Sequence, residues 1–237
     1  MSNVNEATAG PTCLRTRYEN DRFAGPFPLG TAGQMSFVGL SLSRAAFTRP
    51  GPTTNDPYVN RHLDSPMVAQ LRTHLAVGAR VEPLLGPDRV VWRSLFFSKD
   101  PNSKDVMWHQ DGHFWNIDPP LTITAWLAIE SSCGDNCIEL IPGSHKTVFR
   151  HVSAPAGSQF PEVAEPDARS VAQAMELPVD AGSFILFDRN LVHRSRPGGT
   201  HRRLALSIRI APRSVKIDPH LLPADGRVLP LHEDQRF

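Results

Sequence analysis

The chain has 237 residues, of which 40% are apolar, and its 25 basic and 24 acidic residues leave a formal net charge of +1. This length and composition allow one substantial core, so we expect a single domain over residues 1–237. The balanced charge argues against binding to nucleic acid or to an anionic membrane, and no apolar run reaches the length of a membrane span. The first ten residues lack a signal pattern, so a cytoplasmic location is expected.

The first 60 residues are rich in glycine, proline, serine, threonine and asparagine. These residues interrupt the apolar runs, such as Met35–Val38, before any helical or strand period is established. The composition predicts an irregular N-terminal arm over residues 1–60. Such an arm could fold over the rest of the chain as a lid.

Residues 64–79 have the pattern of a helix. Pro66 suits the first helical position after Asp64 or Ser65 as the N-cap, and Gly78 is placed to end the helix. The apolar residues at helical spacing are Met67, Leu71 and Leu75.

After Pro87 the pattern changes to short β-type runs separated by turn residues. The runs cover residues 90–98, 121–129, 183–187 and 204–210. Many short strands in a chain of this size are typical of a sandwich or a jelly roll. We therefore expect an all-β core over residues 88–211, with peripheral helices.

Two of these runs alternate in a way that predicts a cavity. In residues 121–129 every odd position is apolar, whereas the even positions include Thr122, Thr124 and Trp126. In residues 204–210 the apolar positions alternate with Ala205, Ser207 and Arg209. Because successive side chains of a strand point to opposite faces, one face packs in the core and the other offers polar groups to a cavity.

A possible metal site is formed by His109, Asp111 and His193. In an extended strand, residues two apart share a face, so His109 and Asp111 would converge. A second imidazole from His193 would complete two histidines and one carboxylate on one side of a metal. This facial set leaves open positions and is typical of non-haem Fe(II) oxygenases.

Four segments resemble the phytanoyl-CoA dioxygenase family of Fe(II)/2-oxoglutarate oxygenases, in the order that the family has them. They are residues 108–112 (Trp-His-Gln-Asp-Gly), 121–128 (Leu-Thr-Ile-Thr-Ala-Trp-Leu-Ala), 141–146 (Ile-Pro-Gly-Ser-His-Lys) and 191–197 (Leu-Val-His-Arg-Ser-Arg-Pro). The resemblance covers residues 90–211 and implies a double-stranded β-helix, a cupin-like jelly roll, with iron held by His109, Asp111 and His193. Asn136 stands where the family usually has glycine.

The same resemblance implies how 2-oxoglutarate is held. Its distal carboxylate would pair with an arginine about ten residues after the second histidine, a position that both Arg202 and Arg203 satisfy. Strand alternation favours Arg203, which shares the face of small and polar side chains. The resemblance gives Ser195 as a hydroxyl partner of that carboxylate and places Trp126 in the co-substrate pocket, where Thr124 shares its strand face.

Three further residues are candidates for contact with substrate, each with an ordinary structural alternative. Arg93 could pair with an acidic substrate or co-substrate, or form a structural ion pair. Trp115 could contact substrate or only pack. His113 lies four residues after His109, but Gly112 and the strand context argue against a helical zinc site, so it would line the pocket or be structural.

The resemblance implies a dioxygenase that uses Fe(II), 2-oxoglutarate and dioxygen to hydroxylate an unactivated C–H bond of a small molecule, as in specialised metabolism, with release of succinate and CO2. Ferryl-dependent desaturation, cyclisation or epimerisation at the same site remains an alternative, as does a non-catalytic jelly-roll metal-binding module. Halogenation is disfavoured because Asp111 occupies the position that would otherwise admit chloride. Monomer and homodimer are equally compatible with the sequence.

Overall fold

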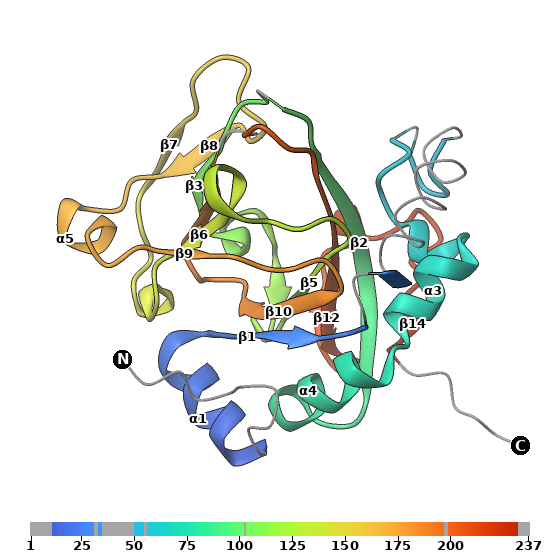
Figure 1. Cartoon of the computed structure of the whole chain (residues 1–237). Helices are drawn as coiled ribbons and strands as arrows, with labels where there is room; N and C mark the ends of the chain where they lie inside the picture. The colour runs from blue at the N-terminus through green and yellow to red at the C-terminus, as the bar shows by residue number, and fades with distance from the viewer. Residues whose placement is uncertain are drawn as a thin grey trace, which may run out of the picture.

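The computed structural model describes residues 11–30, 33–34, 50–54, 56–101, 103–196 and 199–231. In these parts of the chain, two facing β-sheets form a jelly roll, as the sequence predicts (Figure 1). The six-stranded sheet consists, in spatial order, of β1 (Phe23–Pro28), β10 (Ser183–Asp188), β5 (Ile123–Ala128), β12 (Arg203–Pro212), β2 (Arg89–Lys99) and β14 (Leu229–Pro230). The four-stranded sheet consists of β3 (Val106–His109), β11 (His193–Ser195), β6 (Ile138–Leu140) and β9 (Met175–Leu177). Two short pairs join β4 (Ile117–Asp118) to β13 (Lys216–Ile217) and β7 (His151–Ser153) to β8 (Glu162–Ala164).

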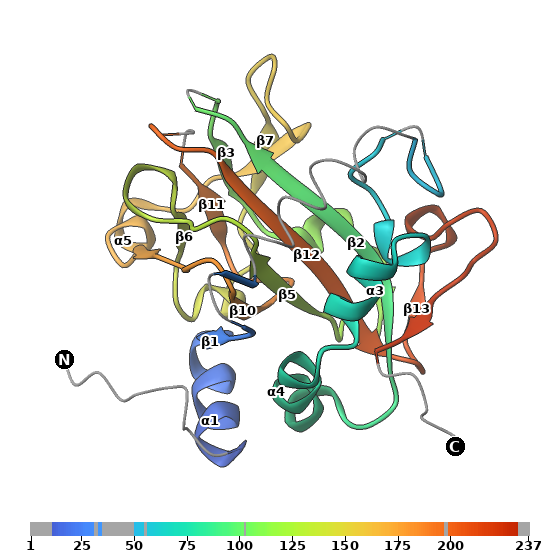
Figure 2. The same cartoon turned by 45° about the vertical axis from the view of Figure 1, so that its right-hand side comes forward.

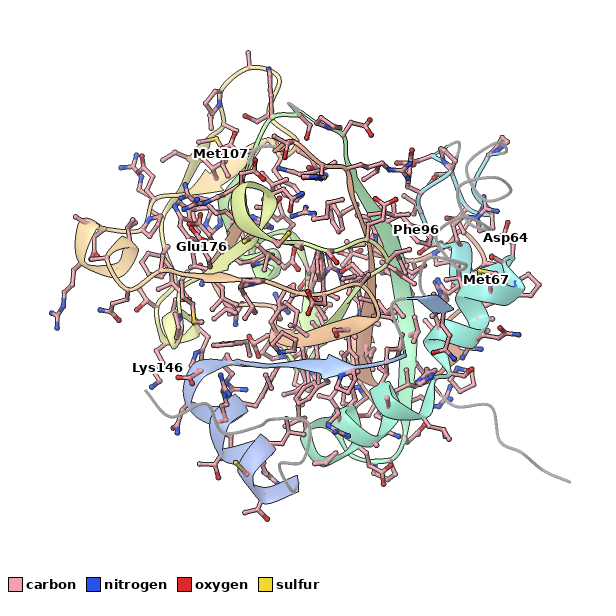
Figure 3. All side chains as sticks on the ribbon, in the orientation of Figure 1. Asp64, Met67, Phe96, Met107, Lys146 and Glu176 are labelled. Atoms are coloured by element: carbon pink, nitrogen blue, oxygen red, sulfur yellow. The ribbon has the colours of Figure 1, made fainter. Side chains whose placement is uncertain are left out.

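Helices cover the outer face of the six-stranded sheet, away from the four-stranded sheet (Figures 1 and 2). They are α1 (Pro11–Asp21), α3 (Pro66–Arg72) and α4 (Leu75–Leu85), and the short α5 (Ala168–Val171) lies at the edge of the other sheet. Phe96 of β2 and Met67 of α3 lie in the same outer apolar cluster (Figure 3). Within the described residues, no helix is long and apolar enough to cross a membrane. The single-turn helices are η2 (Arg61–Leu63), η3 (Asp111–Phe114), η4 (Gly134–Asn136), η5 (Ser144–Lys146) and η6 (Pro219–Leu221).

The predicted alternation of β5 divides its side chains between two apolar clusters. Ile123, Ala125 and Leu127 lie in the outer cluster with the helices. Trp126 lies in the inner cluster, between the two sheets. Thr122 departs from the prediction of a cavity-facing hydroxyl: it is buried, accepts a hydrogen bond from the Trp92 indole at 3.1 Å and donates one to the Ile210 carbonyl at 2.9 Å.

The prediction of an irregular arm is wrong for residues 11–28, which form α1 and β1. Strand β1 pairs antiparallel with β10, although its sequence contains one glycine and two prolines. It tolerates the prolines because it is an edge strand. Gly25 has φ +110, and a Cβ there would lie 2.9 Å from the Phe184 carbonyl oxygen, so the pairing requires glycine. The run Met35–Val38, where a lid would begin, lies outside the described residues.

The prediction of one helix over residues 64–79 is also wrong, because two helices meet at His74. Ser65 and Pro66 begin α3 as expected, and α3 ends at Arg72. His74 is extended, and its side chain accepts a hydrogen bond from the Ala76 N–H, so a new helix begins at Leu75. Gly78 is buried inside α4, which ends at Leu85 with Gly86 as its C-cap.

The break between α3 and α4 predicts that two leucine variants differ in their effect on the free energy of unfolding. Leu71 is 6% exposed and Leu75 is 80% exposed, although a continuous helix would bury both. We expect Leu71→Ala to lower the free energy of unfolding by about 2–5 kcal/mol, because it leaves a cavity under α3. Leu75→Ala is the matched control and should change it by less than about 0.5 kcal/mol. Urea denaturation measures both, and equal losses would contradict the break.

Candidate metal centre

The three predicted metal ligands converge at one end of the inner space. His109 ends β3, Asp111 begins η3 and His193 begins β11. The pairing of β3 with β11 places the two histidines opposite each other, with ring centroids 4.2 Å apart. One ligand atom from each of the three residues lies within 4.8 Å of the others, and all three residues are buried. The donor set therefore fits one metal ion.

The prediction that Asp111 lies on an extended strand with His109 is wrong. Strand β3 ends at His109, and only Gln110 between the two ligands is extended, with φ −114° and ψ 117°. The Gln110 side chain donates hydrogen bonds to the carbonyls of Thr147 at 3.0 Å and Asn190 at 2.7 Å. Its side-chain oxygen also accepts a hydrogen bond from the Phe149 N–H. Gln110 is thus a positioning residue that the sequence pattern did not reveal.

Both histidines have their ring orientation fixed by a backbone carbonyl two residues earlier. Nδ1 of His109 lies 2.8 Å from the Met107 oxygen, and Nδ1 of His193 lies 2.9 Å from the Leu191 oxygen. A carbonyl only accepts, so each Nδ1 carries the proton and each Nε2 keeps its lone pair for a metal. Burial, with a smaller contribution from His193, lowers the pKa of His109 to about 3, and burial also lowers the pKa of His193. Both rings are therefore neutral near pH 7, the form that binds metals.

The third ligand, Asp111, is held by Arg209 of β12. Oδ2 of Asp111 lies 2.9 Å from Nη1 of Arg209, whereas Oδ1 lies 3.9 Å from Nε2 of His109. Arg209 also donates a hydrogen bond to the Thr124 hydroxyl at 2.7 Å, and its guanidinium lies over the Trp115 ring. One carboxylate oxygen therefore remains for a metal while the other is bound by a guanidinium. Strand alternation predicts that Arg209 lies on this face of β12, but it does not reveal the ion pair with Asp111.

A pocket with an empty volume of about 410 Å³, which includes its open mouth, adjoins these ligands. His109, Asp111 and His193 lie on its wall together with Arg203 and Ser195. Its apolar lining is Phe97, Val106, Trp126, Ile138, Phe160 and Phe187.

Arg203 is a buried guanidinium without a carboxylate partner among the described residues. It is 2% exposed and donates hydrogen bonds to the Asn136 carbonyl at 2.8 Å and to the Ser195 hydroxyl at 3.0 Å. Burial lowers its pKa to about 10, so it remains charged near neutral pH. Arg202 instead lies at the surface, 3.5 Å from the Glu130 carboxylate. The pocket therefore contains a cation whose charge no described acidic residue compensates.

The other predicted residues occupy different positions around the pocket. Thr124 lies behind Arg209 rather than on the pocket wall, and Trp115 packs edge-on against Trp92. His113 is exposed, stacks on His151 with 3.7 Å between the ring centroids, and its Nε2 lies 2.7 Å from the Glu162 carboxylate. Neither His113 nor Trp115 lines the pocket.

The connection between β7 and β8 covers part of the metal end of the pocket. Phe160 in this connection lies 4.6 Å from the His109 ring and 5.3 Å from the Phe114 ring. The His113–Glu162 ion pair ties β8 to η3, which begins with Asp111. No sequence signal distinguished Phe160, because it lies in a loop of ordinary composition.

The profile of the phytanoyl-CoA dioxygenase family matches residues 48–204, well over half of the chain. The chain belongs to the phytanoyl-CoA dioxygenase family. A phytanoyl-CoA dioxygenase of Arabidopsis thaliana is 33% identical over 110 residues, which are 45% of this chain and 38% of that protein. The dioxygenase lolE1 of Epichloe uncinata is 26% identical over 132 residues, 53% of this chain and 46% of that protein. Each of these matches thus spans less than half the length of the curated relative.

Solved structures show the same fold at low sequence identity. The epimerase SnoN, in complex with Fe3+, alpha ketoglutarate and nogalamycin RO, aligns with a TM-score of 0.75 at 19% identity, covering 95% of this chain and 98% of that one. CytC3 with Fe(II) and alpha-ketoglutarate aligns with a TM-score of 0.65 at 23% identity, covering 90% and 81%. EctD from S. alaskensis aligns with a TM-score of 0.72 at 18% identity, covering 98% and 90%.

The donor geometry predicts the metal affinity of single variants. We expect Asp111→Ala to weaken Ni(II) binding by at least about 100-fold, since outer-shell changes alone cost about 10–100-fold. His113→Ala is the matched control, because it removes the histidine that shares a His-x-x-x-His spacing with His109 and should leave affinity unchanged. Calorimetric titration measures both constants. A larger loss in His113→Ala than in Asp111→Ala would disprove the assigned donor set.

Proposed function

We propose that this protein is an Fe(II)- and 2-oxoglutarate-dependent dioxygenase that hydroxylates an unactivated C–H bond of a small molecule. The observation that supports it best is one pocket containing both a facial donor set and a buried, uncompensated Arg203. A structural metal site needs the donors but has no use for such an arginine. This combination argues against a non-catalytic metal-binding module.

The donors fit Fe(II) in number and chemistry. His109 and His193 would bind through Nε2, and Asp111 would bind through Oδ1 while Arg209 retains Oδ2. Two imidazoles and one carboxylate on one side leave positions for a bidentate co-substrate and for dioxygen. When bound, the iron would supply the redox chemistry that couples decarboxylation of 2-oxoglutarate to succinate and CO2 with oxidation of substrate.

The residues of this chain would hold 2-oxoglutarate by its distal carboxylate. Arg203 can offer a charge-assisted hydrogen bond, and the Ser195 hydroxyl beside it is within 3.0 Å of the guanidinium. Trp126 lies under Arg203, with 5.6 Å between the guanidinium carbon and the ring centroid. Thr124 contributes indirectly, by binding the arginine that holds Asp111.

Apolar side chains would keep water from the reacting atoms. Phe187 lies 4.7 Å from the His193 ring, and Phe160 lies 4.6 Å from the His109 ring. Both line the pocket. Low polarity around the donors strengthens their electrostatic interactions and limits side reactions.

Desaturation, cyclisation or epimerisation by the same site is the alternative outcome. The likeness to an epimerase concerns the fold, so it does not select among these reactions. The likeness to SnoN, an epimerase from nogalamycin biosynthesis, supports specialised metabolism as the setting. Halogenation is not favoured, because Asp111 is buried in ligand position.

The test of the proposal is anaerobic titration of the Fe(II)-loaded protein with 2-oxoglutarate, followed by exposure to dioxygen. We expect a weak visible charge-transfer band on titration and then formation of succinate. A protein that binds the metal yet gives neither the band nor succinate would be a binding module. Identification of the oxidised product from a substrate screen would then separate hydroxylation from the alternatives.

The proposed role of Arg203 predicts how its loss changes the affinity for 2-oxoglutarate, and the neighbouring Arg202 provides the control. Arg203→Ala should weaken 2-oxoglutarate binding by about 2–5 kcal/mol, at least about 30-fold, because a buried carboxylate loses its cation. Arg202→Ala removes only a surface ion pair and should change binding by less than about 3-fold. Anaerobic titration of the metal-loaded variants measures both. If the two effects were reversed, the distal carboxylate would bind elsewhere.

A further inference from the structure

Arg93 and Arg209 form a cross-strand pair of like charge on the inner face of the six-stranded sheet. They are register partners on β2 and β12, and register partners point to the same face. The next partners along these strands on that face are Leu95 with Ser207 and Phe97 with Ala205. Ser207 and Phe97 line the pocket. Like charges directly opposite each other destabilise a sheet unless an anion compensates them.

Among the described residues, an acidic group lies at close range to only one of these two arginines. Arg209 has its ion pair with Asp111 at 2.9 Å and its hydrogen bond to Thr124. Arg93 is half-buried and has no hydrogen bond and no ion pair within 4.0 Å with any described residue. Burial lowers the pKa of Arg93, whereas the charges of Asp111 and Asp56 raise it. Arg93 is not among the residues that line the pocket, but its register partner Arg209 is, so Arg93 lies beside the metal end of the pocket.

A bound metal and co-substrate would increase this imbalance. Asp111 would then share its charge with a divalent cation, and the distal carboxylate of 2-oxoglutarate would pair with Arg203. The positive charges of Arg93 and Arg209 beside the metal would then exceed the negative charge that balances them. An uncompensated guanidinium next to a pocket attracts a ligand with anionic oxygens.

We propose that the substrate carries a carboxylate or phosphate group that binds Arg93, beside Arg209, while the carbon to be oxidised lies at the metal. This inference rests on the proposed function, because it assumes that 2-oxoglutarate occupies Arg203. Trp115 lies against the Arg209 guanidinium and so limits the directions from which such an anion approaches. Arg93 is therefore a specificity-determining residue.

The test uses the Ni(II)-loaded protein saturated with 2-oxoglutarate, which binds ligands without turnover. The probes are benzoate against benzamide and hexanoate against hexanamide, with phenyl phosphate to separate phosphate from carboxylate. Calorimetric titration at constant ionic strength should show at least one anion binding about 10-fold or more tightly than its neutral partner, which corresponds to about 1.4 kcal/mol. The tighter of benzoate and phenyl phosphate identifies the anion class.

Variants at Arg93 connect that preference to the residue. Arg93→Gln should abolish the preference for the anion, Arg93→Lys should retain part of it, and the surface variant Arg202→Gln should retain all of it. Arg209 is not varied, because it holds Asp111. If Arg93→Gln fails to fold, the wild-type preference and its reduction in Arg93→Lys remain measurable.

Three results would overturn the inference. The first is that the wild-type protein shows no preference for any anion. The second is that Arg93→Gln retains the preference in full. The third is that Arg93→Gln loses as much affinity for 2-oxoglutarate as for the anionic probe, which would assign Arg93 to the co-substrate. Failure of the proposed function has a different signature. The Ni(II)-loaded wild-type protein would then not bind 2-oxoglutarate at all, whatever the anions do.

Discussion

The ion pair between Asp111 and Arg209 joins the two sheets at the point where the chemistry would occur. Asp111 follows the last residue of β3 in the four-stranded sheet, and Arg209 lies in β12 at the middle of the six-stranded sheet. A buried ion pair contributes little net stability, because desolvation offsets the attraction, but removal of one partner costs about 3–5 kcal/mol. Its main effect here is geometric. It fixes the direction of a carboxylate that sits in a short turn rather than on a strand, and so fixes the third donor relative to the two histidines.

The pocket has two cationic ends that differ in what surrounds them. At the metal end, Arg209 is compensated by a carboxylate and held by the Thr124 hydroxyl. At the other end, the described residues that accept hydrogen bonds from Arg203 do so through neutral oxygens, those of Asn136 and Ser195. Neutral acceptors orient a guanidinium without removing its charge, so Arg203 remains available for an anionic ligand. Arg93 also differs from Arg209, because no described residue accepts a hydrogen bond from Arg93.

The elements outside the two sheets pack against them on both sides. Leu14 and Tyr18 of α1 join Val77 and Val81 of α4 in the cluster that covers the outer face of the six-stranded sheet. Packing of that face leaves the inner face free to present polar side chains. On the inner side, Phe160 and the His113–Glu162 ion pair bring the β7–β8 pair over the metal end. This end of the pocket is therefore covered by parts of the chain that have no recognisable pattern.

The sequence by itself predicted the all-β core, the face of β12 on which Arg203 lies, and the grouping of His109, Asp111 and His193 that the structure brings together. The strands and the face of Arg203 follow from the period of two along a strand, and the grouping of His109, Asp111 and His193 follows from motifs that resemble those of a known family. Both signals are visible in single chain segments. Tertiary structure decided the rest. Strand β1 forms from a proline- and glycine-containing segment because β10 offers it an edge to pair with, and the helix breaks at His74 because its side chain caps a second helix. The Asp111–Arg209 pair joins residues 98 positions apart, and Phe160 reaches His109 from a loop. Contacts of this kind depend on how the sheets face each other, and no periodicity within either segment encodes that.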